Sequence, residues 1–269
     1  MTRIAFDIGG TNIRVARVSL DGIGEVRKVP TSQEPNKGVV KLAELARDIA
    51  GREPIEVAAG GLPGIVVNGV IKDAPNLPQW AGLAFEKEFS TALGGASVAV
   101  RNDSDMAALG EAVYGAGKGK RVVAYMGIGT GVGGGRIVDG QIDTGAYGLE
   151  PGHQIIDVKE LKDLEYFVSG RAFEKRFGVH PKDAPREAYS EMTPILAAGL
   201  YNTMLHWSPD VLVLGGSMVV GVNGYRIEEV VSALKKIPGK LPFMPELRMA
   251  ELKDAAGLHG ARALLGQKH

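Results

Sequence analysis

Short apolar runs that end in glycine turns dominate the pattern of this chain, and the two clearest follow one plan. Residues 3–8 form an apolar run that predicts a buried strand, two glycines follow, and the run from Ile13 to Leu20 predicts a second strand. The plan returns at residues 122–138, where two apolar runs flank Gly129-Thr130-Gly131. Strands so closely spaced around glycine form β-hairpins. Two equivalent hairpins predict two similar half-folds that face each other across a cleft.

Strand and helix patterns share the rest of the chain. Helical spacing of apolar residues predicts helices at 38–50, 83–93, 104–113, 160–177 with a break at 169–170, 187–207, 226–236 and 257–266. Further strands are predicted at 25–31, 56–59, 97–100, 210–214 and 246–251, with a hairpin at 65–71 around Asn68-Gly69. Mixed strands and helices in two hairpin-led halves indicate an α/β fold and not a β-sandwich.

The glycine turns are candidates for phosphate binding, because glycine lets backbone N–H groups reach phosphate oxygens without a Cβ in the way. A tight hairpin without a ligand explains each turn on its own, but a third turn, Gly215-Gly216, follows the apolar run at 210–214. Residues 129–134 also match the G-x-G-x-x-G pattern of dinucleotide folds, which requires a helix to follow. A strand and a turn follow here, so an NAD site is excluded, and the P-loop pattern is absent.

Composition narrows the class of protein. The 269 residues include 31 basic and 31 acidic side chains, so nothing predicts nucleic-acid or anionic-membrane binding. There is no cysteine, which excludes disulfides, thiolate zinc sites and cysteine nucleophiles. No apolar run approaches the ~18–20 residues that span a bilayer, and the chain starts directly with the first predicted strand. We therefore expect a soluble, cytoplasmic protein without a membrane partner.

Polar side chains at two strand ends are candidates for chemistry. Asp7 ends a buried strand beside the first glycine turn and needs a partner, because an unpaired buried carboxylate is costly. Mg²⁺, bound directly or through water, is one such partner, and the amides of the turn are another. Asn102 and Asp103 end a strand and begin a helix. They are either helix N-caps or, at the strand ends where α/β sheets place ligands, catalytic groups.

Further candidates lie in turns. Glu150 and His153 flank Pro and Gly, which favours a turn that binds hydroxyl groups, or a surface turn, over a helical metal site. Gly60 to Gly64 predicts a turn where the backbone can approach a ligand. Residues 75–80 are too rich in proline for regular structure and carry Asn76 and Trp80, of which Trp80 either stacks on a sugar or anchors the core. The remaining histidines are expected to be structural or solvent-exposed: His180, His206, His259 and His269.

Taken together, these motifs resemble the ROK family of sugar kinases, which has the hexokinase/actin/Hsp70 fold. The matching segments follow the family's order over nearly the whole chain: Asp7 to Asn12, Gly61 to Gly64, Asn76 with Trp80, Asn102 to Glu111, Gly127 to Gly135, Glu150 to His153 and Leu214 to Gly216. The resemblance implies two ribonuclease-H-like domains of mixed sheets flanked by helices, with a central cleft. The first would be residues 1–107 completed by a C-terminal helix at about 257–269, and the second residues 108–256.

The resemblance also implies roles for single residues, with ATP and Mg²⁺ as cofactors. Asp103 would be the general base, and Asp7 would hold Mg²⁺. The ATP phosphates would lie among Gly9, Gly10, Thr11, Asn12, Thr130 and Gly131, and the adenosine near Gly215, Gly216 and Ser217. The sugar would bind at Gly61, Asn76, Asn102, Asp103, Glu150, His153 and Glu165.

The sequence departs from the family pattern between His153 and Glu165, where family members usually carry a cysteine-rich zinc motif. Eleven residues intervene and none is cysteine, so such a zinc site is excluded. The resemblance therefore implies a zinc-free hexose kinase that converts glucose to glucose 6-phosphate. Fructose, mannose or an N-acetylhexosamine are the other acceptors, and polyphosphate is the other donor. A sugar-binding sensor without turnover is the non-enzyme alternative, and a homodimer is expected.

Overall fold

The computed structural model describes residues 2–19, 21–143, 145–146, 148–221, 223–239, 241 and 244–267. Leu20, the predicted end of the second strand, and His269 lie outside the described residues. The chain divides into two compact units, one of Met1–Val113, Thr144–Gly148 and Asp254–His269, the other of Tyr114–Asp143 and Leu149–Lys253. The sequence placed its boundaries at 107 and 257, and two domains with a cleft stay a prediction.

The first unit is built on a mixed sheet. Its strands are β1 (Thr2–Ile8), β2 (Asn12–Val18), β3 (Ile23–Pro30), β4 (Ile55–Leu62) and β7 (Ser97–Asn102). Their order is β3-β2-β1-β4-β7. The first three strands pair antiparallel, whereas β4 and β7 run parallel to β1 and therefore need crossover connections.

The second unit repeats this arrangement. Its strands are β8 (Val122–Ile128), β9 (Val132–Val138), β10 (Gln141–Ile142), β13 (Val211–Gly215) and β14 (Glu246–Met249). Their order is β10-β9-β8-β13-β14, again with an antiparallel meander beside parallel strands. The same order with the same strand directions confirms the two similar half-folds that the glycine hairpins predicted.

Helices and two short hairpins complete the fold. The helices are α1 (Pro35–Ala50), α2 (Phe85–Ala92), α3 (Asp103–Tyr114), α4 (Leu164–Val168), α5 (Gly170–Phe177), α6 (Arg186–Trp207), α7 (Ser217–Val220), α8 (Ile227–Leu234) and α9 (Ala256–Gly266). The hairpins pair β5 (Ile65–Val67) with β6 (Val70–Asp73), and β11 (Ile155–Asp157) with β12 (Lys162–Asp163). Among the described residues, no helix is both long and apolar enough to cross a membrane.

One helix prediction was wrong at its start. Residues 160–163 were expected to be helical, but Lys162 and Asp163 form β12 and the helix begins at Leu164. The Asp163 side chain accepts a hydrogen bond from the Tyr166 amide at 2.8 Å, so it caps α4. The predicted break is present, because the Ser169 side chain caps α5 in the same way. The start of α4 is therefore set by the Asp163 cap and not by the helical spacing of apolar residues before it.

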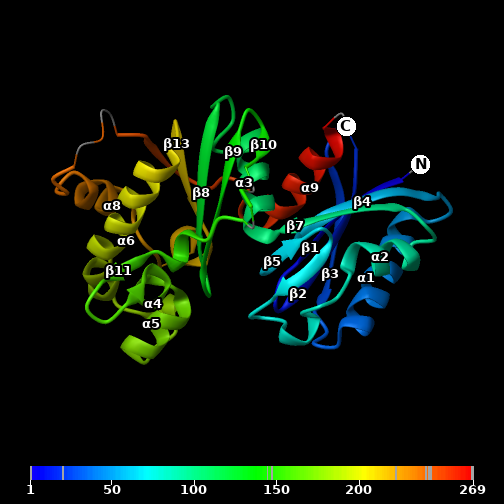
Figure 1. The fold of residues 1–269 in the computed structure, drawn as a ribbon, viewed down its shortest axis with the longest axis horizontal. Helices are drawn as coiled ribbons and strands as arrows, with labels where there is room; N and C mark the ends of the chain where they lie inside the picture. The colour runs from blue at the N-terminus through cyan, green and yellow to red at the C-terminus, as the bar shows by residue number, and fades with distance from the viewer. Residues whose placement is uncertain are drawn as a thin grey trace. The chain divides into compact units, whose positions relative to one another are not determined.

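The two faces of β1 pack against different helices, because side chains alternate along a strand. Ile4 and Phe6 belong to the apolar core that α1 and α2 cover, and the Phe6 ring meets the Phe89 ring edge-on at 5.3 Å between centroids. On the other face Arg3 donates to the carbonyl oxygen of Leu265 in α9 at 3.2 Å. Figure 1 shows α9 on the side of this sheet opposite α1 and α2.

Helix α9 joins the first unit from the far end of the chain by close contact with α3. A Cβ on Gly260 would lie 1.9 Å from the Met106 carbonyl oxygen, and one on Gly110 would lie 2.3 Å from the Ala256 carbonyl oxygen. Only glycine lets the two backbones approach so closely. Leu258 and other side chains of α9 are buried, and the helix packs on β1 and β4.

The core of the second unit lies between its sheet and α4, α6 and α8. Leu196 and Leu200 of α6 share one buried cluster with Leu212 of β13. Tyr189 extends the cluster, and its ring meets the Tyr225 ring edge-on at 5.3 Å between centroids. Figure 1 shows α4, α5, α6 and α8 gathered beside this sheet.

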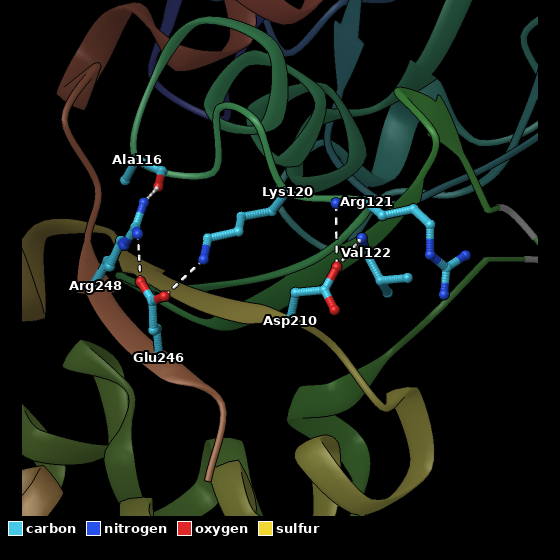
Figure 2. Close-up of polar contacts among 7 residues, drawn as sticks. All are labelled: Ala116, Lys120, Arg121, Val122, Asp210, Glu246 and Arg248. Carbon is cyan, nitrogen blue, oxygen red and sulfur yellow. Dashed lines mark hydrogen bonds and ion pairs between the residues drawn. The ribbon is translucent and has the colours of Figure 1, made fainter. Parts of the chain in front are cut away.

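Charged side chains hold the segment that enters β8 against the neighbouring strands (Figure 2). The Asp210 carboxylate accepts a hydrogen bond from the Val122 amide at 2.8 Å. Lys120 Nζ lies 2.6 Å from Glu246 Oε1 on β14, and Arg248 also contacts Glu246. The start of β8 is therefore tied to both parallel strands of its sheet.

Candidate active site

The first glycine turn is closed by its own backbone and by the end of β3. The Gly9 amide donates to the Asn12 carbonyl oxygen at 2.9 Å, and the Thr31 hydroxyl donates to the Gly9 carbonyl oxygen at 2.7 Å. A Cβ on Gly10 would lie 2.8 Å from Cβ of Asn76, so the structure brings these two predicted site residues together. Thr11 at the tip is exposed. Thr31 lies in none of the motifs, so the sequence did not predict its contact with this turn.

The second glycine turn is one residue shorter. Ile128 pairs with Val132, whereas in the first hairpin Ile8 pairs with Ile13, so three residues form this turn and four form the other. The Gly129 amide donates to the Gly131 carbonyl oxygen at 2.9 Å. The two turns are therefore equivalent in place but not identical in loop geometry.

Glu165 supports the second turn from α4. Its Oε2 accepts a hydrogen bond from the Val132 amide at 2.7 Å. The Gly170 amide, at the start of α5, donates to the Gly129 carbonyl oxygen at 2.7 Å. One carboxylate oxygen of Glu165 is thus engaged by the hairpin, and its predicted contact with a sugar stays a prediction for the other oxygen.

Asp7 has a partner that the sequence did not suggest. Arg14 stands opposite it on β2, and Nη1 of Arg14 lies 3.2 Å from Asp7 Oδ2. Burial raises the pKa of Asp7, and the Arg14 guanidinium opposes this shift without cancelling it. Arg14 also reaches Asp254, at 3.3 Å. Neither magnesium nor the turn amides are needed to explain a largely buried Asp7.

The described residues hold no group of three or more His, Asp or Glu side chains placed to bind a metal ion. A single carboxylate such as Asp7 fits a different kind of magnesium site, in which the protein supplies few of the ligands. Mg²⁺ keeps several waters and is commonly held by one or two carboxylates together with the phosphates of a substrate. The donor set is therefore suited to a magnesium ion that arrives on a nucleotide.

Asn102 and Asp103 lie at the start of α3 with different contacts, and the capping role that the sequence left open belongs to Asn102. The Asn102 side chain accepts hydrogen bonds from the amides of Ser104 at 2.7 Å and Asp105 at 3.3 Å, so Asn102 caps α3. Its amide group also donates to the Gly64 carbonyl oxygen at 2.8 Å. Asp103 is the first residue of α3 and is not needed as its cap.

Gly61 is part of a strand and not of a turn. Gly60 and Gly61 were expected in a turn, but both lie within β4, and the chain turns only after Leu62. A Cβ on Gly60 would lie 2.2 Å from the Phe6 carbonyl oxygen, and one on Gly61 would lie 3.0 Å from Asp103 Cα. These glycines allow close backbone packing, and Gly61 places β4 directly against the start of α3.

Glu150 and His153 lie at a 3₁₀ turn, η2 (Pro151–His153), as the sequence predicted. His153 Nδ1 is 2.8 Å from Asp163 Oδ2. Residues of this turn, with His206 and Trp207 of α6, line an open pocket of about 260 Å³. Asp163 was missed by sequence reasoning, although its place at the start of α4 is a typical N-cap position.

The third glycine pair lies beside the second turn. Gly216 has φ +84°, and a Cβ there would lie 2.3 Å from the Ile128 carbonyl oxygen. A Cβ on Gly129 would be 3.8 Å from Ser217 Oγ, so the predicted site residue Ser217 lies beside the second glycine turn. The chain beyond Ser217 borders a pocket of about 300 Å³, lined among others by Ala184, Arg186, Tyr189, Val219, Asn223 and Tyr225.

Trp80 anchors the core and does not present a sugar platform. Its side chain is fully buried, its Nε1 donates to the Ser32 carbonyl oxygen at 3.1 Å, and its ring stacks on Phe85. A Cβ on Gly38 would lie 2.3 Å from the Trp80 ring, which shows how closely α1 packs on it. Of the two alternatives from the sequence, the structural one is correct.

Trp80→Phe is expected to destabilise the first unit by about 2–3 kcal/mol, because it removes a buried hydrogen bond and leaves part of the indole volume empty. Chemical denaturation of the variant measures this loss. The sequence alternative, in which Trp80 stacks on a sugar, instead predicts weaker sugar binding with unchanged stability, which calorimetry on the folded variant would detect.

Comparisons with known proteins match nearly the whole chain. The family model of the ROK family matches residues 3–268. A glucokinase of Streptomyces coelicolor is 36% identical over 312 residues, covering 97% of this chain and 96% of its own. A polyphosphate glucokinase of Mycobacterium tuberculosis is 30% identical over 262 residues, covering 95% and 88%.

Solved structures of ROK-family kinases are also similar to this chain. A ROK hexokinase from Thermus thermophilus superposes with a TM-score of 0.81 at 27% identity, covering 98% of this chain and 97% of its own. A ROK glucokinase from Streptomyces griseus, in complex with glucose and AMPPNP, superposes with a TM-score of 0.79 at 25% identity, covering 98% and 99%. The hexokinase-type α/β fold predicted from the sequence is therefore confirmed.

Proposed function

Because this chain belongs to the ROK family, we propose that it is a kinase that transfers the γ-phosphoryl group of ATP to a hydroxyl group of a hexose, with glucose 6-phosphate as the product. The observation that carries the proposal is the 36% identity to a glucokinase over nearly the full length of both chains. The glucose and AMPPNP bound to the Streptomyces griseus structure support the same pair of substrates.

In this proposal the glycine turns bind the phosphates of ATP. Gly9 to Asn12 and Gly129 to Gly131 connect paired strands, and the Gly9 and Gly129 amides close their own turns. The phosphate oxygens would accept hydrogen bonds from the other amides of the two turns. Asp7 would hold a Mg²⁺ ion that arrives with the nucleotide, and the ion would supply positive charge beside the phosphates. The segment Gly215 to Ser217 and the pocket that follows it receive the nucleoside.

Asp103 is the proposed general base. A sugar hydroxyl is about as weak an acid as water, so a carboxylate does not deprotonate it beforehand. Asp103 instead accepts the proton while the sugar oxygen bonds to the γ-phosphorus and the bond from that phosphorus to the β-γ bridging oxygen breaks. Asn102, Asn76, Gly61, Glu150, His153 and Glu165 form the sugar site.

A coupled assay of ADP release with magnesium ATP tests this function. Glucose, fructose, mannose and N-acetylhexosamines are offered in parallel, and sugar phosphate formation from polyphosphate is measured in a matched series. We expect the highest kcat/KM with glucose and ATP, and a kcat within the ~1–100 s⁻¹ typical of kinases. Preference for polyphosphate would assign the chain to the donor class of its mycobacterial relative.

The same assay separates the kinase from a sugar sensor. A sensor would bind a sugar, as measured by calorimetry, and turn over none of the acceptors with either donor. That result would overturn the proposed function. Size-exclusion chromatography with light scattering tests the homodimer that we also propose from the family.

A further inference from the structure

A histidine and an aspartate form a defined pair at the turn η2. His153 Nδ1 lies 2.8 Å from Asp163 Oδ2. Backbone pairing brings the two residues together, because Ile155 pairs with Asp163 between β11 and β12 and the Leu164 amide donates to the Gln154 carbonyl oxygen at 3.0 Å. The two side chains therefore meet beside a short backbone ladder.

The other oxygen of Asp163 is also held. Its Oδ1 accepts a hydrogen bond from the Tyr166 amide at 2.8 Å, in the first turn of α4. An anionic side chain is favoured at the N-terminus of a helix. With one oxygen bound to an amide and the other aimed at His153, the carboxylate has little freedom to turn away.

An ionised carboxylate only accepts hydrogen bonds, so the ring nitrogen that faces it must carry a proton. We propose that Asp163 is a positioning residue that holds neutral His153 in the tautomer protonated at Nδ1, so that Nε2 is left as a hydrogen-bond acceptor for a hydroxyl group of the sugar. The inference deepens the proposed function and rests on it for the identity of the ligand.

The carboxylates around the His153 ring all raise its pKa. The hydrogen bond to Asp163 raises the pKa of His153, burial opposes the shift, and Glu165 and Glu150 add to the rise. His206 of α6 lines the same pocket. On β9, which also packs on this turn, Arg136 is engaged by Asp143. Nε2 loses its acceptor role when the ring is protonated, so sugar binding should weaken as pH falls through this raised pKa.

Asp163→Asn tests the tautomer directly. Asparagine is also a good N-cap, so its oxygen keeps the bond to the Tyr166 amide while its NH₂ group turns to His153. The ring must then accept at Nδ1 and carry its proton on Nε2. Proton–nitrogen correlation spectra of the imidazole, assigned with His153→Gln, should show the Nδ1–H form in the wild type and the Nε2–H form in Asp163→Asn, with a lowered His153 pKa.

Kinetics test the consequence for the sugar. Asp163→Asn should raise the sugar KM about tenfold, because a donor now faces the sugar where an acceptor was, and should leave kcat within about twofold. In the wild type the sugar KM should rise at low pH, whereas in the variant this dependence should disappear. Glu160→Gln is the matched control, because it removes an exposed carboxylate of the same loop and should change neither constant.

Two results would overturn the inference. One is an Nε2–H tautomer for His153 in the wild type. The other is an unchanged sugar KM in Asp163→Asn although the tautomer has switched. Failure of the proposed function is recognised separately: a wild-type protein that phosphorylates no sugar defeats the kinase assignment, while the spectra still decide whether Asp163 sets the tautomer.

Discussion

Asp103→Asn is expected to lower kcat for sugar phosphorylation by about three orders of magnitude, within the range that a general base contributes. Asparagine keeps the shape of the side chain but cannot take the proton that the sugar hydroxyl must lose. Asn102 already caps α3, so the exchange leaves the helix start intact. Affinity for glucose, measured by calorimetry without ATP, should change by less than about threefold, since a hydrogen bond to the hydroxyl remains available.

Asp48→Asn is the control for the loss of one negative charge in the same unit, because Asp48 lies exposed on α1. It should keep full activity. A retained kcat in Asp103→Asn, with only a large rise in KM, would show that Asp103 binds the sugar without acting as the base.

Gly260→Ala is expected to destabilise the first unit by about 3 kcal/mol, at the upper end for overpacking. The new Cβ would meet the Met106 carbonyl oxygen, and a backbone atom within α3 cannot move aside as a flexible side chain can. For a chain of this size the loss corresponds to a fall in Tm of about 6–12 °C, which calorimetry measures.

Gly266→Ala provides the matched control in the same helix. It lies exposed at the end of α9, and a Cβ there would meet nothing within 4 Å. Its Tm should be unchanged or slightly higher, because alanine costs less backbone entropy than glycine in a helix. Equal Tm values for both variants would show that the α3–α9 contact does not limit stability.

Local signals predicted most of the elements. The hairpin around Asn68 and Gly69 has φ angles of 50° and 73°, the left-handed values that this residue pair favours. The strand predicted at 210–214 overlaps β13 (Val211–Gly215), which is buried on both faces as parallel strands require. Such features depend on residues adjacent in sequence, so the sequence alone is enough to recognise them.

Side-chain contacts that depend on strand register or helix packing were not predictable in the same way. Arg14 faces Asp7 only because the hairpin register sets them opposite each other. Asp163 reaches His153 only because β11 and β12 pair. Trp80 proved to be a core residue because α1 presents a glycine to its ring. Each contact needs a register or a helix position that no local pattern states.

The sequence by itself determined the repeated glycine hairpins, the α/β class and the family, because these follow from residue spacing and from motifs in a fixed order. Only the tertiary structure decided which of Asn102 and Asp103 caps α3, what balances Asp7, and which group orients His153. The physical reason is that a side chain's role depends on what its polar atoms meet. Some of those neighbours follow closely in the sequence, as Ser104 follows Asn102, and others are set opposite each other by strand pairing, as Arg14 is to Asp7.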